Sequence, residues 1–157
     1  MFKRILVPLD GSERAERALP IAARLARAYD SSVFLVRVLG TEPTSVPTAP
    51  ARPLTEPFGE TDRSVAESYL EGVAGSELLS GISVHTEVPV GLVSPSILSA
   101  ASNKYASIIV MCSHGYTGVR RWWMLGSVSA KVARVRLLLV GSRRLPVCQV
   151  AKRMRKP

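Results

Sequence analysis

The central motif of the chain is IIVMCSHGYTGVRRWWMLGSV, residues Ile108 to Val128. Its first four residues are apolar, as in a strand that is buried on both faces of a sheet. A polar turn with Gly115 and Gly118 follows, and from Ser127 onward apolar residues return at helical spacing. A glycine-bearing loop between a buried strand and a helix N-terminus presents backbone N–H groups that have no partner within the helix. Such a loop can hold a phosphate, although most loops of this kind are only turns.

The composition sets the broad class of protein. The chain has 157 residues, of which 46% are hydrophobic, and this suits one domain with its own core. The opening MFKRILVPLD is too short for a signal peptide, and no apolar run approaches the ~20 residues of a membrane span. The two cysteines, Cys112 and Cys148, lack the spacing of a disulfide framework or a zinc site. We therefore expect a cytoplasmic protein without a membrane partner.

The net charge of +9 is concentrated at the C-terminal end. A tail of this composition could contact nucleic acid or an acidic membrane surface. A solvated end is the more common meaning of such a run, so no nucleic-acid partner is expected. We divide the chain into a domain of residues 1–141 and a basic tail of residues 142–157. Six basic residues and no acidic ones lie in this tail: Arg143, Arg144, Lys152, Arg153, Arg155 and Lys156.

The chain opens with a strand, a turn and a helix. The apolar run Lys3 to Leu9 predicts a strand, and the turn Asp10-Gly11-Ser12 can cap a helix that runs to about Tyr29. Pro20 lies inside this helical pattern and is expected to kink it.

Strand and helix patterns then alternate along the chain. Between them, residues 39–62 contain five prolines and are expected to form a mobile surface loop. His85 falls on the polar face of an alternating strand, so it is expected at the surface. The further expected elements are a strand at Ser32–Val38, a helix at about Arg63–Leu79, a strand at Ile82–Val88, a helix opened by Ser94-Pro95 with Pro95 at its first position, a strand at Ile108–Met111, a helix from Ser127, and a last strand at Leu137–Val140.

This order predicts an α/β fold, a single doubly wound open sheet of five parallel strands with helices on both faces. Ligands bind to such sheets at the carboxyl ends of the strands, where the strand order reverses. The long glycine loop follows the fourth strand, and the turn after the first strand is short. We therefore expect the strand order 3-2-1-4-5, with a crevice between strands one and four. Asp10 and the loop of residues 115–127 would face each other across it.

Three segments together resemble the universal stress protein family: ILVPLDGSERAERAL at the start, SHGYTG in the turn, and GSVSAKV after the loop. The resemblance covers about residues 2 to 140. It implies the strand order given above and a homodimer formed through the last strand. Many members bind ATP through the motif G-x-x-G, nine residues, then G-S or G-T.

The resemblance implies a role for each matching position. Asp10, with the backbone of Pro8 and Leu9, would contact the adenine and ribose, and the backbone of Val38 would contact the base. A plain helix cap is the alternative role for Asp10. The remaining candidates are Met111, which would pack near the nucleotide or belong to the core, Cys112, His114 and Gly115 in the first half of the phosphate motif, and Gly126, Ser127, Val128 and Ser129 in the second half.

The resemblance therefore implies a stress-response or signalling module that binds ATP, with Mg²⁺ able to bridge the phosphates. Two features differ from the family motif. Cys112 stands at the position of the first glycine, and ten residues instead of nine separate Gly115 from Gly126. These differences leave open a family member that binds no nucleotide and acts through protein contacts.

A slow ATP hydrolase is a further alternative, but the sequence offers little for catalysis. Hydrolysis needs a positioned water, and His114 is the only histidine near the loop. No acidic residue lies between Met111 and Val140. We expect no catalytic residue and no metal ligand from the protein.

Overall fold

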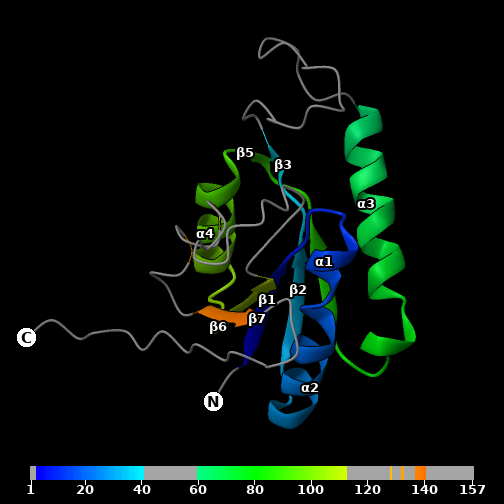
Figure 1. The fold of residues 1–157 in the computed structure, drawn as a ribbon, viewed down its shortest axis with the longest axis vertical. Coiled ribbons are helices and arrows are strands. Elements are labelled where there is room, and N and C mark those ends of the chain that lie inside the picture. Colours follow the sequence, from blue (N-terminus) through cyan, green and yellow to red (C-terminus); the bar gives the residue numbers. More distant parts are fainter. Residues whose placement is uncertain (1–2, 41–59, 113–127, 129–131, 133–136, 141–157) are drawn as a thin grey trace, which may run out of the picture.

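The first strand of the chain lies at the centre of the sheet in the computed structural model (Figure 1). The structure describes residues 3–40, 60–112, 128, 132 and 137–140. The strands are β1 (Arg4–Pro8), β2 (Ser32–Val36), β3 (Leu39–Gly40), β4 (Val84–Glu87), β5 (Val90–Gly91), β6 (Ile108–Cys112) and β7 (Leu137–Val140). The helices are α1 (Glu13–Glu16), α2 (Leu19–Tyr29), α3 (Glu60–Ala74), the 3₁₀ turn η1 (Glu77–Leu79) and α4 (Val93–Asn103).

Five strands form one parallel sheet in the order β4-β2-β1-β6-β7. Leu6 in the middle of β1 lies opposite Phe34 of β2 on one side and Ile109 of β6 on the other. The order reverses at β1, since the chain moves outward to β2 and β4 on one side and then returns to β6 on the other. This arrangement confirms the α/β fold with a parallel sheet.

The two faces of the sheet are covered by different helices. Ile5 and Val7 of β1 belong to a core cluster that includes Ala22 of α2 and Leu70 of α3. Leu6, which lies between them in the chain, belongs to a second cluster with Ile97 of α4. Successive side chains of a strand point to opposite faces, so a strand covered on both sides must be apolar at every position. In Figure 1, α1, α2 and α3 accordingly lie on one side of the sheet and α4 on the other.

The expected first helix is divided into two helices. Ser12 caps α1, which ends after four residues at Glu16, and α2 begins at Leu19. Pro20 lies in the first turn of α2, where its missing N–H removes no intrahelical hydrogen bond. The predicted kink at Pro20 is therefore wrong, because the helix starts anew instead of bending.

The expected second strand also ends early, and a small second sheet follows it. β2 stops at Val36, so Val38 lies between β2 and β3. β3 pairs in parallel with β5, and Gly40 lies opposite Gly91. A Cβ atom on Gly40 would lie 3.0 Å from Cγ2 of Val93, so glycine permits this close approach to α4. The prediction of a single sheet missed this pair of strands.

The remaining boundaries differ in detail. Helix α3 ends at Ala74, before Gly75, and the expected last turn of that helix is the separate 3₁₀ turn η1. Helix α4 begins at Val93, which makes Pro95 its third residue and not its first. Of the expected loop at 39–62, Leu39–Gly40 form β3 and Glu60–Asp62 belong to α3, while residues 41–59 lie outside the described residues. Within the described part of the chain, no helix is long and apolar enough to cross a membrane.

Candidate functional site

The candidate site lies at the carboxyl ends of β1, β2 and β6. β1 ends at Pro8, and the N–H of the next residue, Leu9, still donates to the carbonyl of Val36 at 2.8 Å. Pro8 and Leu9 are both buried, whereas Asp10 is exposed. The chain therefore leaves the sheet at Asp10, directly beside the point where the strand order reverses.

Asp10 shapes the turn after β1. Its Oδ1 accepts hydrogen bonds from the backbone N of Ser12 at 2.9 Å and from the Ser12 hydroxyl at 2.6 Å. The Ser12 Oγ in turn accepts from the N–H of Ala15 at 3.2 Å and caps α1. Ser12 is thus the helix cap, and Asp10 holds the capping side chain in place.

Arg37 packs against this turn from the side of β2. Its guanidinium lies so near Gly11 that a Cβ atom there would be 3.3 Å from Arg37 Nη2. The guanidinium carbon also lies 5.0 Å from the centre of the Tyr69 ring, within the range of a cation–π contact. Tyr69 belongs to α3, so Arg37 connects the turn to that helix.

Tyr69 also connects α3 to α1. Its hydroxyl donates to Oε1 of Glu16 at 2.8 Å. Burial, and then the hydrogen bond to the Glu16 carboxylate, raise the pKa of Tyr69 well above its usual value. Tyr69 therefore stays neutral and remains a hydrogen-bond donor at any physiological pH.

Arg37 and Tyr69 were not among the candidates drawn from the sequence. The signal for Arg37 is a charged residue at the end of the apolar run SVFLVRV, where an ordinary buried strand would continue with an apolar residue. Tyr69 carries no comparable signal, because its spacing matches the apolar stripe of α3.

The other candidates are only partly brought together. Val38 is half-buried beside the second core cluster. Met111 is a buried member of that cluster, in agreement with the expectation that it could belong to the core. Val128 packs against the same cluster. His114, Gly115, Gly126, Ser127 and Ser129 lie outside the described residues, as does the additional residue of the loop.

Cys112 ends β6 in ordinary strand geometry. It pairs with Val140 of β7, and its side chain is buried with 7% exposure. Among the described residues, positive φ outside glycine occurs only at Asp30 and Tyr105. The thiol at the position of the family glycine therefore does not force an unusual backbone angle there.

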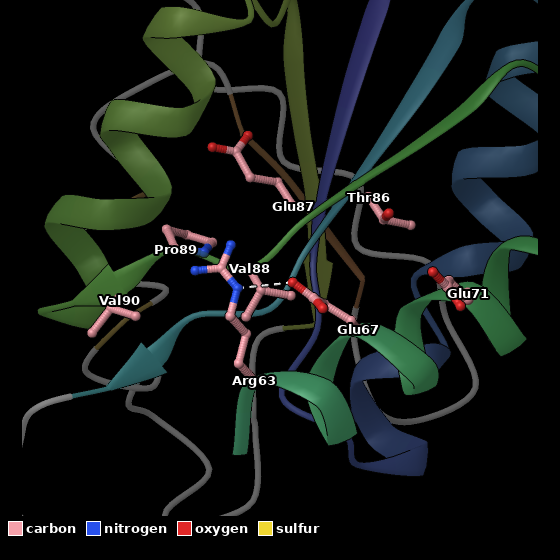
Figure 2. A pocket seen from close by; sticks show the side chains of 8 residues that line it. All are labelled: Arg63, Glu67, Glu71, Thr86, Glu87, Val88, Pro89 and Val90. Carbon is pink, nitrogen blue, oxygen red and sulfur yellow. Dashed lines mark hydrogen bonds and ion pairs between the residues drawn. The ribbon is translucent and has the colours of Figure 1, made fainter. Parts of the chain in front are cut away.

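A separate groove of about 670 Å³ lies between α3 and the edge strand β4 (Figure 2). Its wall carries Glu67, Glu71 and Glu87, which would repel a phosphate. Arg63 pairs with Glu67 at 2.8 Å across the helix surface, and Lys104 Nζ lies 3.2 Å from Glu87 Oε2. The groove is thus not the expected phosphate site. No group of three metal-ligating side chains occurs in the part of the chain that the structure describes.

The parallel sheet and the candidate site at the carboxyl ends of β1, β2 and β6 together define an open α/β domain. The candidate site lies where the strand order reverses. The model of the universal stress protein family matches residues 1–144, and the chain belongs to this family.

Relatives support the same assignment. The chain is 30% identical to universal stress protein MJ0531 of Methanocaldococcus jannaschii over 134 residues, which cover 85% of this chain and 77% of that protein. It is 30% identical to universal stress protein YxiE of Bacillus subtilis over 142 residues, covering 86% and 94% of the two chains. The structure of the universal stress protein from Archaeoglobus fulgidus in complex with dAMP has the same fold, with a TM-score of 0.60, 19% identity, and coverage of 90% and 97%.

Proposed function

We propose that the chain is a module that binds an adenine nucleotide, with ATP as the expected ligand. The observation that carries this proposal is the position of Asp10, exposed directly after β1 at the point where the strand order reverses. Open α/β sheets bind ligands at this point. The family membership and the dAMP complex of a protein with the same fold give further support.

In this proposal the nucleotide spans the carboxyl ends of β1 and β6. The Asp10 carboxylate accepts from the ribose hydroxyls, and the backbone of Val38 contacts the base. Mg²⁺ is bound through the phosphates and not by a protein cage. The phosphates lie at the loop of residues 115–127 and the following helix N-terminus, with contacts from the proposed residues His114, Gly115, Gly126, Ser127, Val128 and Ser129.

The decisive experiment identifies the bound molecule. The protein is purified without added nucleotide, denatured, and analysed by chromatography and mass spectrometry. ATP is then titrated with and without Mg²⁺ by calorimetry. We expect about one adenine nucleotide per chain from the sum of retained and titratable ligand. No retained nucleotide and no heat from folded protein would contradict the proposal.

A pair of variants locates the site. Asp10→Asn keeps an oxygen acceptor for Ser12 but removes the charge, so the turn is retained. We expect ATP affinity to fall roughly tenfold to a hundredfold, as for the loss of a charged hydrogen bond. Glu77→Gln removes an exposed carboxylate of η1, far along the chain from the turn, and is the matched control with unchanged affinity.

Cys112 supports a second candidate function, a family member that acts through protein contacts without nucleotide. The buried thiol occupies the position of the first motif glycine. In this case the wild type shows no rise in melting temperature with ATP, and Cys112→Gly gains one. The nucleotide proposal instead expects a rise in both proteins.

We further propose that the molecule is a cytoplasmic homodimer that pairs through β7, the edge strand next to β6. Nucleotide binding would then shift the population of one dimer conformation and act as a switch.

A further inference from the structure

Arg37 contacts two elements near the candidate site, and the proposed function gives it no role. The backbone of Arg37 is fixed, because its N–H donates to the carbonyl of Glu87 at 3.1 Å just beyond the paired part of β2 and β4. From this fixed point the side chain reaches two different elements, the turn at Gly11 and the ring of Tyr69 on α3.

The backbone of Gly11 favours glycine because of its positive φ, and the Arg37 guanidinium lies beside it. The φ angle of Gly11 is +84°, and all three atoms nearest to an added Cβ belong to the Arg37 guanidinium, at 3.3 to 3.6 Å. The guanidinium thus lies on the side of the turn where a side chain at Gly11 would stand. A charged group at this place limits the ways in which the turn can rearrange.

The contact with Tyr69 holds the guanidinium in turn. The ring lies 5.0 Å from the guanidinium carbon, and its hydroxyl is bonded to Glu16 of α1. Asp10 and Glu16 are near enough to Tyr69 to raise its pKa, while Arg37 lowers it. Two carboxylates, one guanidinium and one phenol therefore share a single small region at the end of β1 and β2.

We propose that Arg37 is a positioning residue of the candidate nucleotide site. Its guanidinium holds the turn of residues 10–12 in the shape that presents Asp10, and Tyr69 links that turn to α3. This inference rests on the proposed function for its ligand. The effect of Arg37 on local opening of the turn, however, can be measured in the protein without nucleotide.

The first test measures amide hydrogen exchange of Ser12, whose N–H donates to Asp10, by NMR in the nucleotide-free protein. Arg37→Gln keeps a planar polar group but removes the charge and the full stack. We expect exchange in the turn to become about five- to tenfold faster, as for a local opening, with little change in the strands. Arg24→Gln, an exposed arginine of α2, is the control and leaves the exchange unchanged.

The second test separates stacking from plain charge. Arg37→Lys keeps the charge but lacks the flat guanidinium, so we expect it not to restore protection of the turn. Tyr69→Leu removes the ring and also the hydrogen bond to Glu16, so its effect on the turn should be at least that of Arg37→Gln. The double variant Arg37→Gln/Tyr69→Leu should then add little to Tyr69→Leu, because the contact between the two residues is already lost.

The ligand-bound test follows. ATP affinity of Arg37→Gln should fall about three- to tenfold, the range expected when one cation–π contact is lost. Unchanged turn exchange in Arg37→Gln, or full restoration by Arg37→Lys, would overturn the positioning role. A wild type that binds no nucleotide would refute the proposed function, and the exchange data would still decide the role of Arg37.

Discussion

Gly11 has a backbone conformation that only glycine adopts without strain. Its φ is +84°, and it lies between Asp10 and Ser12 at the candidate site. Gly72 in α3 is the opposite case, because it lies in a helix with nothing within 4 Å of an added Cβ. The same substitution at these two glycines should therefore have opposite effects on stability.

We expect Gly11→Ala to lower the free energy of unfolding by about 1–2 kcal/mol, the cost of a left-handed conformation for a residue with a Cβ. Gly72→Ala should raise it by about 0.5–1 kcal/mol, because alanine loses less entropy than glycine in a helix. Urea denaturation at 25 °C measures both. Equal effects of the two changes would mean that the turn at Gly11 is not held in its observed shape.

Two serines offer a similar comparison. Ser12 Oγ accepts from Ala15 N and donates to Asp10, whereas the Oγ of Ser76, before η1, is buried without a hydrogen-bond partner among the described residues. Ser12→Ala should cost about 1 kcal/mol of stability through loss of the cap. Ser76→Ala should be neutral or stabilising, since it removes an unsatisfied polar group. Chemical denaturation of both variants tests this, and a larger loss for Ser76→Ala would contradict it.

The sequence allows part of the site to be predicted. The turn Asp10-Gly11-Ser12 is recognisable because aspartate, glycine and serine each favour turns for local reasons. The contact of Arg37 with Tyr69 is not recognisable, because these residues are far apart in the chain and meet only when β2 and α3 pack. A propensity acts within a few residues, so it cannot report a contact of this kind.

At the scale of elements, α3 is joined to α1 by the hydrogen bond from Tyr69 to Glu16. α1 has only four residues, too few to be stable by itself. Its position therefore depends on its cap, on the buried Ala15 and on this link to α3. The division between α1 and α2 was not predicted because the apolar spacing continues across Arg17 and Ala18, so Pro20 was expected to bend one helix instead of opening a second one.

Because of this hydrogen bond, the free energy of unfolding is expected to change with pH in the alkaline range. Near neutral pH we expect Tyr69→Phe to cost about 1 kcal/mol, the typical value of a hydrogen bond. The pKa of Tyr69 is raised in the folded protein above its ordinary value of 10.0. Above about pH 10 the unfolded chain loses the tyrosine proton while the folded protein keeps it, so wild-type stability falls with rising pH. The advantage of the wild type over Tyr69→Phe should therefore narrow.

Urea denaturation of both proteins from pH 7 to 10.5 measures this difference, in which the titration of all other groups cancels. A gap between wild type and Tyr69→Phe that widens above pH 10 would refute the assigned direction of the pKa shift.

At the scale of the whole molecule, the alternation of strands and helices was sufficient to predict a parallel α/β fold. This pattern extends over many residues, and strands buried on both faces are apolar throughout. The sheet of β3 and β5 escaped prediction because each strand has two residues and no periodicity. Gly40 of β3 also lies close to Val93 of α4, an approach that only the folded chain reveals.

The two edges of the main sheet differ in their protection against pairing. The edge strand β4 reads VHTE and includes the charged Glu87, whereas β7 reads LLLV and has no polar residue. Charged residues on an edge strand discourage pairing with another chain, and an apolar edge without them invites it. We therefore expect two copies of the molecule to pair through β7 and not through β4.

Sedimentation velocity and amide hydrogen exchange together test this pairing. At high concentration we expect twice the chain mass of 17.0 kDa.

In an open edge strand only alternate N–H groups face the neighbouring strand, so exchange alternates between slow and fast residues. β4 should show this alternation at every concentration and is the internal control. β7 should be protected at every residue in the dimer and should alternate after dilution to the monomer. An alternating β7 in a dimeric sample would place the interface elsewhere, and a monomer at all concentrations would exclude the dimer.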